Sequence, residues 1–220
     1  MATLFLIRHG LTAQTGHVLY GQMTGIPLDH RGRAQAAQLA ARFTPIRLTA
    51  IYTSPLERCV QTVEPLAAAQ RLPVIERDEL IEMDAGRWTG RRLGALRKQR
   101  SWVTVQRRPS EFRFPGGGEG FADAQERVGT EVERIARRHH RGRVAIATHG
   151  DIVRILLARF AGMPLDDFQR MVVDTASVSV VSIDGGIARV LLVNDTGGLD
   201  RFGHAPVPPW ESPPARKVGG

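Results

Sequence analysis

Short apolar runs alternate with longer segments of helical periodicity along the chain, and this alternation limits the possible folds more than any other feature. Residues 3–7, 50–53 and 144–147 form the clearest apolar runs, and a shorter one lies at residues 73–75. Runs of this length between helical segments are typical of buried strands. Strands that alternate with helices usually pair in parallel, so the sequence predicts an α/β fold with a mostly parallel sheet.

Helix signals fill the spaces between these runs. Asp29 suits the N-cap of a helix, and Ser54 followed by Pro55 is a helix-start signal that would place Arg58 in the first turn. Helices are expected at residues 31–43, 91–98, 121–139 and 152–160, the third of them amphipathic. A terminal hairpin is expected from residues 177–183 and 187–193, joined by Asp184-Gly185-Gly186.

The chain of 220 residues suits a single domain, which we expect to span residues 1–196. Residues 99–120 are rich in Arg, Pro and Gly, and we expect them to form an irregular segment that covers a site. Residues 197–220 are rich in Pro and Gly, which predicts a flexible tail.

Composition disfavours several classes of partner and location. The net charge is +8, but the arginines are scattered, which argues against nucleic acid as the main ligand and leaves small anionic substrates open. Cys59 is the only cysteine, so the chain cannot form an internal disulfide, and a reducing compartment fits. No leader and no apolar stretch of about 18 residues is evident. We therefore expect a cytoplasmic protein without membrane contact.

Three of the predicted strands end in residues that suit anion binding. The first ends at Arg8-His9-Gly10, the second at Ser54 with Arg58 a turn later, and the third at Thr148-His149-Gly150. In open parallel sheets, ligands bind outside the carboxyl ends of the strands. Guanidinium groups match phosphate oxygens, and glycine lets the backbone approach a ligand closely. If the strands are neighbours, their ends form a phosphate-binding cavity.

Five segments in order carry a family resemblance: LIRHGLT, PLDHRGRAQA, SPLERCVQT, IEMDAGRWTG and THGDIVR. Together they closely resemble the histidine phosphatase superfamily, over residues 4–193. The resemblance implies the phosphoglycerate mutase-like fold, a three-layer α/β/α domain. It also implies that catalysis needs neither a metal nor another cofactor.

The resemblance assigns roles to individual residues. It makes His9 the phosphate-accepting nucleophile and Glu82 the proton donor, which acts as base when water later hydrolyses the phosphohistidine. It places Arg8, Arg58 and His149 in the phosphate pocket, where cations would stabilise the transferring group. Further phosphate contacts are expected from Thr15, Gly21 and Gly150.

Some positions depart from the family pattern. Leu11 stands where many relatives carry an acidic or amide residue, and Thr15 stands where many carry asparagine. Gly120 replaces a more usual serine. These changes leave the phosphohistidine chemistry possible, and Thr15 can still donate a hydrogen bond.

Other readings of single residues are weaker. Cys59 does not suit a cysteine-dependent phosphatase, because Pro65 stands where the phosphate-binding loop would need an arginine. His139 and His140 are adjacent and so do not share a helix face, which disfavours a metal site. Packing or lid roles are expected for the three tryptophans, Trp88, Trp102 and Trp210.

The leading hypothesis is a metal-independent phosphomonoesterase that acts on a small phosphorylated metabolite. Two alternatives stay open: phosphoglycerate mutase-type phosphoryl transfer, and a non-catalytic domain that senses an anion. Specificity is expected in residues 99–120 and around Arg87 and Trp88, and Arg107, Arg108 and Arg113 could meet a second anionic group or lie in a solvated loop. A homodimer is possible.

Overall fold

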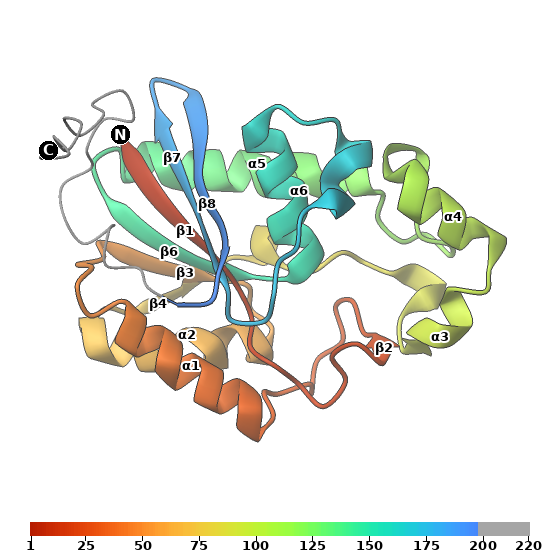
Figure 1. Ribbon diagram of the computed structural model, residues 1–220, viewed down its shortest axis with the longest axis horizontal. Helices are drawn as coiled ribbons and strands as arrows, with labels where there is room; N and C mark the ends of the chain where they lie inside the picture. Colours follow the sequence, from red (N-terminus) through yellow and green to blue (C-terminus); the bar gives the residue numbers. More distant parts are fainter. Residues whose placement is uncertain (198–220) are drawn as a thin grey trace, which may run out of the picture.

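A six-stranded mixed sheet lies at the centre of the computed structural model, which describes residues 1–197 (Figure 1). Its strand order is β4-β3-β6-β1-β7-β8. The first four pair in parallel, and β7 and β8 add an antiparallel edge. The strands are β1 (Ala2–Arg8), β3 (Ala50–Thr53), β4 (Val74–Glu76), β6 (Arg143–Thr148), β7 (Val178–Asp184) and β8 (Ile187–Asp195). The predicted parallel strands and terminal hairpin are therefore confirmed.

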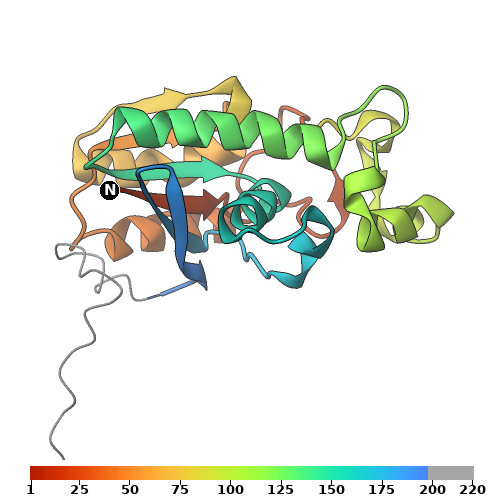
Figure 2. The same cartoon turned by 90° about the horizontal axis from the view of Figure 1, so that it is seen from above.

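Helices cover both faces of the sheet, as Figure 2 shows for α5 and α1. One face carries α1 (His30–Arg42) and α2 (Glu57–Gln70), and the other carries α5 (Phe121–Arg138) and α6 (Gly150–Ala161). Successive side chains of a strand point to opposite faces. Leu4 and Leu6 therefore enter the core under α5 and α6, whereas Phe5 and Ile7 enter the core under α1 and α2. The result is the predicted three-layer α/β/α arrangement.

The start of α2 differs from the prediction. Asp29 caps α1 as expected, accepting a hydrogen bond from the Gly32 amide at 2.7 Å. Helix α2, however, begins at Glu57, two residues later than the Ser54 signal implied, and its N-cap residue, Leu56, makes no side-chain cap bond. The Ser54 hydroxyl instead lies against an imidazole of the site described below. Arg58 still falls in the first turn.

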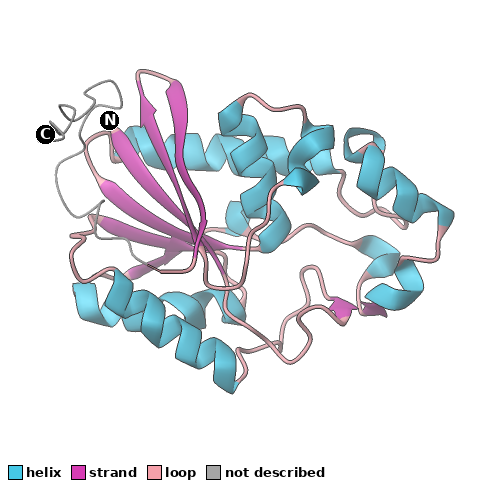
Figure 3. Cartoon of the chain, in the orientation of Figure 1, coloured by secondary structure: helices cyan, strands magenta, loops and turns pink. Residues whose placement is uncertain are grey.

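The segment at residues 91–120 differs from the prediction, as the secondary structure in Figure 3 shows. Residues 91–98 contain a short strand and a four-residue helix rather than the single helix expected, and residues 99–120 are more ordered than expected. A short strand, β5 (Arg91–Arg92), pairs with β2 (Val18–Leu19), and α3 (Leu93–Leu96) follows. The prediction that residues 99–120 are irregular is wrong in two places, where the chain forms the helix α4 (Arg100–Arg107) and the 3-10 turn η3 (Pro109–Glu111). A helix forms because Trp102 and Val105, three residues apart, share the face that packs on the core. Short 3-10 turns also occur at η1 (Asp78–Leu80), η2 (Gly86–Trp88) and η4 (Leu165–Arg170).

Aromatic packing holds this segment to the domain. Trp88 is buried, stacks on Trp102 at 6.0 Å between ring centroids, and contacts Phe112 at 5.3 Å and Phe114 at 5.7 Å. The packing role predicted for Trp88 and Trp102 is therefore confirmed. Trp210 and residues 198–220 of the predicted tail lie outside the described residues. Within residues 1–197, no helix is long and apolar enough to cross a membrane.

Candidate active site

The carboxyl ends of β1, β3 and β6 meet at one edge of the sheet. Because Arg8 pairs in register with Thr148, His9 and His149 leave the sheet side by side. The His9 amide donates to the Thr148 carbonyl at 3.0 Å, and the centroids of the two imidazoles lie 5.4 Å apart. Helix α6 begins at Gly150, directly after His149, so the positive end of its dipole also lies at this edge. The predicted convergence of strand ends is confirmed.

His9 is held as a neutral imidazole with one free nitrogen. Its Nδ1 lies 2.8 Å from the Gly10 carbonyl oxygen, and because a carbonyl can only accept, Nδ1 must carry the proton. The lone pair is then on Nε2. Burial, followed by the charges of Arg58 and Arg8, lowers the pKa of His9 from 6.5 to about 3. The lone pair of Nε2 is therefore unprotonated throughout the neutral pH range.

Two arginines stand beside this imidazole, each with an unused donor. Arg58 is fully buried and donates to the carbonyls of Gly21 at 2.7 Å and Met23 at 3.1 Å. Arg8 donates from Nη1 to the Val173 carbonyl at 2.6 Å. Among the described residues, neither Nε atom has a partner, although both are buried. Both Nε atoms can therefore donate a hydrogen bond to a ligand such as a phosphate oxygen.

Two glycines contribute to the positions of these guanidinium groups. A Cβ at Gly150 would lie 3.0 Å from Arg8 Nε, so a larger residue would crowd the guanidinium. Gly21 has a positive φ of +47°, and a Cβ there would lie 3.1 Å from the Met83 carbonyl oxygen. The Gly21 carbonyl is thereby turned toward Arg58. Both predicted glycines lie at the site and help to place the arginines.

His149 is fully buried and is oriented by two side chains from the start of α2 and the loop before it. Its Nε2 lies 2.9 Å from Ser54 Oγ and 3.5 Å from Cys59 Sγ. Burial, with the charge of Arg58 next in size, places the pKa of His149 well below its usual value. If the Ser54 hydroxyl donates to Nε2, the proton of His149 is on Nδ1, the atom nearest Glu82.

Glu82 lies on the other side of His149, at 3.9 Å between its Oε2 and His149 Nδ1. Its Oε1 accepts a hydrogen bond from the Met83 amide at 3.0 Å. Burial and the charge of Asp151 raise the pKa of Glu82 to about 7, against the opposing effect of Arg58 and Arg8. A carboxyl group with this pKa can donate a proton near neutrality and take one back.

Hydrogen bonds from distant segments hold Glu82 in this position. Gln22 Nε2 donates to the Glu82 carbonyl at 2.8 Å, and the Thr148 hydroxyl donates to the Leu80 carbonyl at 2.6 Å. Arg127 of α5 donates to the carbonyls of Glu79 and Ile81. The carboxylate therefore lies on a loop that is anchored on both sides.

Thr15 lies in the loop that follows β1 and contacts Thr12 and Tyr20. Its hydroxyl contacts the Thr12 hydroxyl at 3.0 Å and accepts from the Thr12 amide at 3.0 Å. It also lies 3.5 Å from the Tyr20 hydroxyl, and the Tyr20 ring lies 6.3 Å from the His9 ring. The phosphate contact expected of Thr15 stays a prediction.

Sequence reasoning missed Tyr20, and it did not assign the contact of Ser54 with His149. The guanidinium of Arg58 lies over the Tyr20 ring, 4.7 Å from its centroid, in a cation–π contact. The only sequence feature that indicated Tyr20 was its position next to Gly21. Ser54 was predicted as a helix cap, whereas its hydroxyl contacts His149. Its place directly after a strand, beside other strand ends of the site, was the signal available.

Other predicted contacts are settled by the structure. Of the three arginines considered for a second anionic group, Arg108 pairs with Glu111 at 3.0 Å and Arg113 pairs with Asp123. The role considered for Arg107, which is exposed at the end of α4, stays a prediction. Cys59 is buried in α2 as expected, and burial raises its pKa to about 12, so the thiolate is strongly disfavoured. His139 Nε2 lies 3.0 Å from the Tyr52 hydroxyl. In the described part of the chain, no cluster of His, Cys, Asp or Glu is placed to hold a metal ion.

Comparisons with known proteins agree with this geometry. The family model of the histidine phosphatase superfamily (branch 1) matches residues 4–196. Phosphoserine phosphatase 1 of Hydrogenobacter thermophilus is 30% identical over 207 residues, which cover 92% of this chain and 96% of that protein. The adenosylcobalamin/alpha-ribazole phosphatase of Escherichia coli is 28% identical, over 87% of this chain and 95% of that protein.

A solved structure is similar over most of the chain. YhfR of Bacillus stearothermophilus has a TM-score of 0.81 and 31% identity, over 87% of this chain and 96% of that chain. The predicted phosphoglycerate mutase-like fold and the predicted class of phosphoric monoester hydrolase are confirmed at the level of the family. The chain belongs to the histidine phosphatase superfamily.

Proposed function

We propose that the protein is a phosphomonoesterase that hydrolyses a small phosphorylated metabolite through a phosphohistidine on His9, without a metal ion. One observation carries the proposal: a neutral His9 with a free Nε2 is close enough to feel the charges of Arg58 and Arg8, and the buried Nε atoms of both arginines lack partners. A phosphoryl group placed beside them would meet a nucleophile and two guanidinium donors at once.

In the first half-reaction, His9 Nε2 attacks the phosphorus atom. A P–N bond forms as the P–O bond to the alcohol breaks, and the departing oxygen takes the proton of Glu82. Arg8, Arg58 and His149 stabilise the negative charge on the three oxygens that do not react. The hydrogen bond from Nδ1 to the Gly10 carbonyl would stabilise the positive charge that develops on the imidazole.

In the second half-reaction, water attacks the phosphorus of phosphohistidine. Glu82, now ionised, accepts a proton from this water, while the P–N bond breaks and its electron pair returns to His9 Nε2. Inorganic phosphate leaves, and both residues are restored to their starting protonation states. The pKa of about 7 suits Glu82 to both roles, since the optimum for an acid-base group lies near the working pH.

The names of relatives support a phosphatase with a small substrate. The two curated relatives described above are a phosphoserine phosphatase and an adenosylcobalamin/alpha-ribazole phosphatase, and each spans nearly the same length as this chain. The alternatives of mutase-type transfer and of anion sensing share the same pocket. They differ from hydrolysis in the fate of the phosphoryl group, which is directly measurable.

The test is phosphate release from a panel of phosphomonoesters in the presence of a chelator, with His9→Ala as the matched variant. Hydrolysis of one or more esters by the parent and loss of turnover in a folded His9→Ala protein are expected. Transfer of the phosphoryl group to a second alcohol without net phosphate release would establish a mutase instead. Thermal stabilisation by phosphate without release or transfer would establish a sensing domain, and turnover by His9→Ala would exclude phosphohistidine chemistry.

A further inference from the structure

All three nitrogens of the Arg127 guanidinium, on helix α5, make hydrogen bonds. Nε and Nη2 donate to the two carboxylate oxygens of Glu119, each at 2.8 Å. Nη1 donates to the carbonyl of Glu79 at 2.6 Å and to that of Ile81 at 3.2 Å. A bidentate carboxylate fixes the orientation of a guanidinium group. Glu119 therefore holds Nη1 against the two carbonyls.

These bonds lie on both sides of Glu82 in the chain. The two carbonyls that accept from Arg127 come before Glu82, and the nearer one belongs to the residue next to it. On the other side, the Glu119 amide donates to the carbonyl of Asp84 at 2.9 Å. The Glu119–Arg127 ion pair therefore fixes the backbone of the proton donor both before and after its side chain.

Glu119 belongs to the segment between α4 and α5, and this segment lies directly against the loop of the proton donor. A Cβ at Gly118 would lie 2.7 Å from the Asp84 carbonyl oxygen and 2.8 Å from the Gly86 nitrogen. Both are backbone atoms, so only glycine allows the two segments to approach this closely. This close contact lets the Glu119 amide reach Asp84 while its carboxylate reaches Arg127.

The ion pair is largely removed from solvent. The exposed fraction of the side chain is 23% for Arg127 and 15% for Glu119. Without Arg127, the carboxylate and the two carbonyls would lose their donors at a place with little access to water. The loop of the proton donor would then move, and a displacement of about 1 Å at a reacting group can lower a rate by about 10²-fold.

We propose that Arg127, oriented by Glu119, is a positioning residue that keeps Glu82 within reach of the departing oxygen. It acts on the reaction only through Glu82 and contacts neither the phosphoryl group nor His9. This inference rests on the proposed function, in which Glu82 is the proton donor. It deepens that proposal, because it makes proton donation depend on an ion pair between α5 and the segment that precedes it.

A residue that acts only through the proton donor has a kinetic signature. An alkoxide leaving group needs a proton, whereas a nitrophenolate ion leaves without one. The ratio kcat/KM reports the transfer onto His9, so it excludes the later step in which Glu82 acts as base. Loss of Arg127 should lower kcat/KM by about tenfold to 10²-fold for an alkyl ester and by less than about threefold for the nitrophenyl ester.

The experiment measures kcat/KM for p-nitrophenyl phosphate and for the alkyl phosphate that the panel shows to be hydrolysed fastest. The proteins are the parent, Arg127→Gln, Glu82→Gln and the double variant Arg127→Gln, Glu82→Gln. If Arg127 acts through Glu82, its substitution should have no further effect once Glu82 is replaced. A purely structural role would lower the rate with both esters, in either background.

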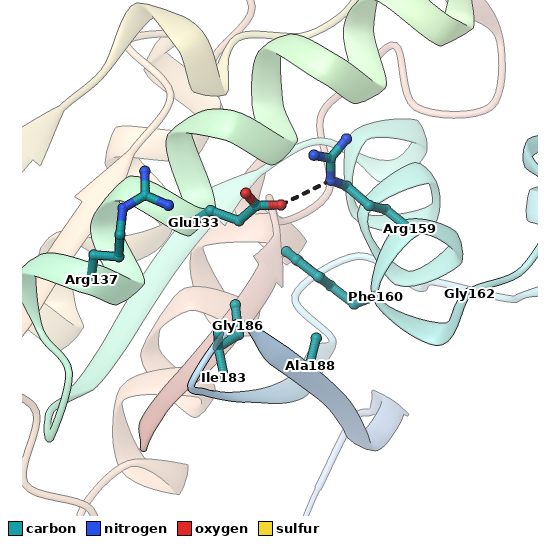
Figure 4. Close-up of a pocket in the computed structure, with 8 residues that line it drawn as sticks. All are labelled: Glu133, Arg137, Arg159, Phe160, Gly162, Ile183, Gly186 and Ala188. Atoms are coloured by element: carbon teal, nitrogen blue, oxygen red, sulfur yellow. Dashed lines mark hydrogen bonds and ion pairs between the residues drawn. The ribbon is translucent and has the colours of Figure 1, made fainter.

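Arg159→Gln is the matched control. The Arg159 side chain is 27% exposed, close to the value for Arg127, and it also pairs with two carboxylates, Glu126 at 2.8 Å and Glu133 at 3.0 Å. Figure 4 shows its bond to Glu133 beside a cavity lined in part by the turn between β7 and β8. That turn lies at the start of β1, at the opposite end of the sheet from the candidate active site. Arg159→Gln should therefore leave kcat/KM unchanged for both esters.

A selective loss of about tenfold to 10²-fold for the alkyl ester in Arg127→Gln, absent from the Glu82→Gln background and from the control, would support the proposal. Equal losses for both esters, no loss, or the same loss in the Glu82→Gln background would overturn it. If Arg127→Gln does not fold, Glu119→Gln is read in the same way, with a smaller loss expected because Arg127 keeps a neutral partner.

Failure of the positioning role and failure of the proposed function give different results. If Glu82→Gln shows the selective loss and Arg127→Gln does not, only the positioning role is refuted. If Glu82→Gln shows no selective loss for the alkyl ester, Glu82 is not the proton donor, and both proposals lose that step.

Discussion

The burial of a neutral His9 can be tested by the pH dependence of the free energy of unfolding, compared between the parent and His9→Gln. The folded protein keeps His9 neutral down to about pH 3, whereas in the unfolded chain the same imidazole takes up a proton near pH 6.5. Below pH 6.5 the unfolded state therefore binds more protons at this position than the folded state. By linkage, His9 makes stability fall as pH falls from about 6.5 toward 3.

The magnitude follows from the pKa difference. One pH unit of such titration corresponds to about 1.36 kcal/mol, so lowering the pH from about 7 to about 4.5 should cost about 2.5 kcal/mol through His9 alone. The His9→Gln protein lacks this group and should lose about 2.5 kcal/mol less than the parent over the same range. Any constant effect of the substitution on packing cancels in this comparison.

The assay is urea unfolding at the two pH values, followed by circular dichroism, for the parent, His9→Gln and His140→Gln. His140 is exposed in a turn, so its substitution controls for the loss of one histidine. The free energy of unfolding should fall with acid equally in the parent and His140→Gln and less in His9→Gln. Identical pH dependence in all three proteins would refute the burial of a neutral His9.

Three further substitutions test the remaining groups. Glu82→Gln should lower kcat for alkyl phosphates by about 10² to 10⁴-fold, and by less for an activated aryl ester, whose leaving group needs no proton. In the parent, kcat/KM should fall above about pH 7 because Glu82 loses its proton, and a pH profile of Glu82→Gln should lack this fall. Ser54→Ala should lower kcat by about tenfold, because His149 loses its orienting hydroxyl, and Ser54→Thr should restore activity; an unchanged rate would exclude this positioning role. Arg58→Lys should lower kcat by at least about 10³-fold, because an ammonium group cannot replace both the two hydrogen bonds to carbonyls and the free Nε donor. Near-normal kinetics of this variant would count against Arg58 as a phosphate ligand.

The fold was largely predictable from local patterns. The apolar run at residues 50–53 coincides with β3, and Asp29 caps α1, because burial and capping are local requirements. Strands β7 and β8 are neighbours at the sheet edge because a tight turn with two glycines, both at positive φ, joins them. Helix α4 was not predicted, because its apolar face is short and its neighbouring residues are rich in Arg, Pro and Gly. The packing of Trp102 on Trp88, which stabilises this helix, is a tertiary contact that the local sequence does not report.

The site was predictable in its members but not in its contacts. Residue types at strand ends and the family resemblance indicated His9, Arg58 and His149, and parallel pairing brings their strands together. The bond between Ser54 and His149 joins positions 95 residues apart, so no local pattern reports it.

The most direct test of the central claim is to trap the phosphoenzyme. The parent is mixed with a good substrate, quenched in alkali, which preserves phosphohistidine, and examined by intact mass and peptide mass spectrometry. A single phosphoryl group on His9 in the parent, absent from the His9→Gln protein, is the result expected. A phosphoryl group on another residue, or sustained hydrolysis by His9→Gln, would contradict the mechanism.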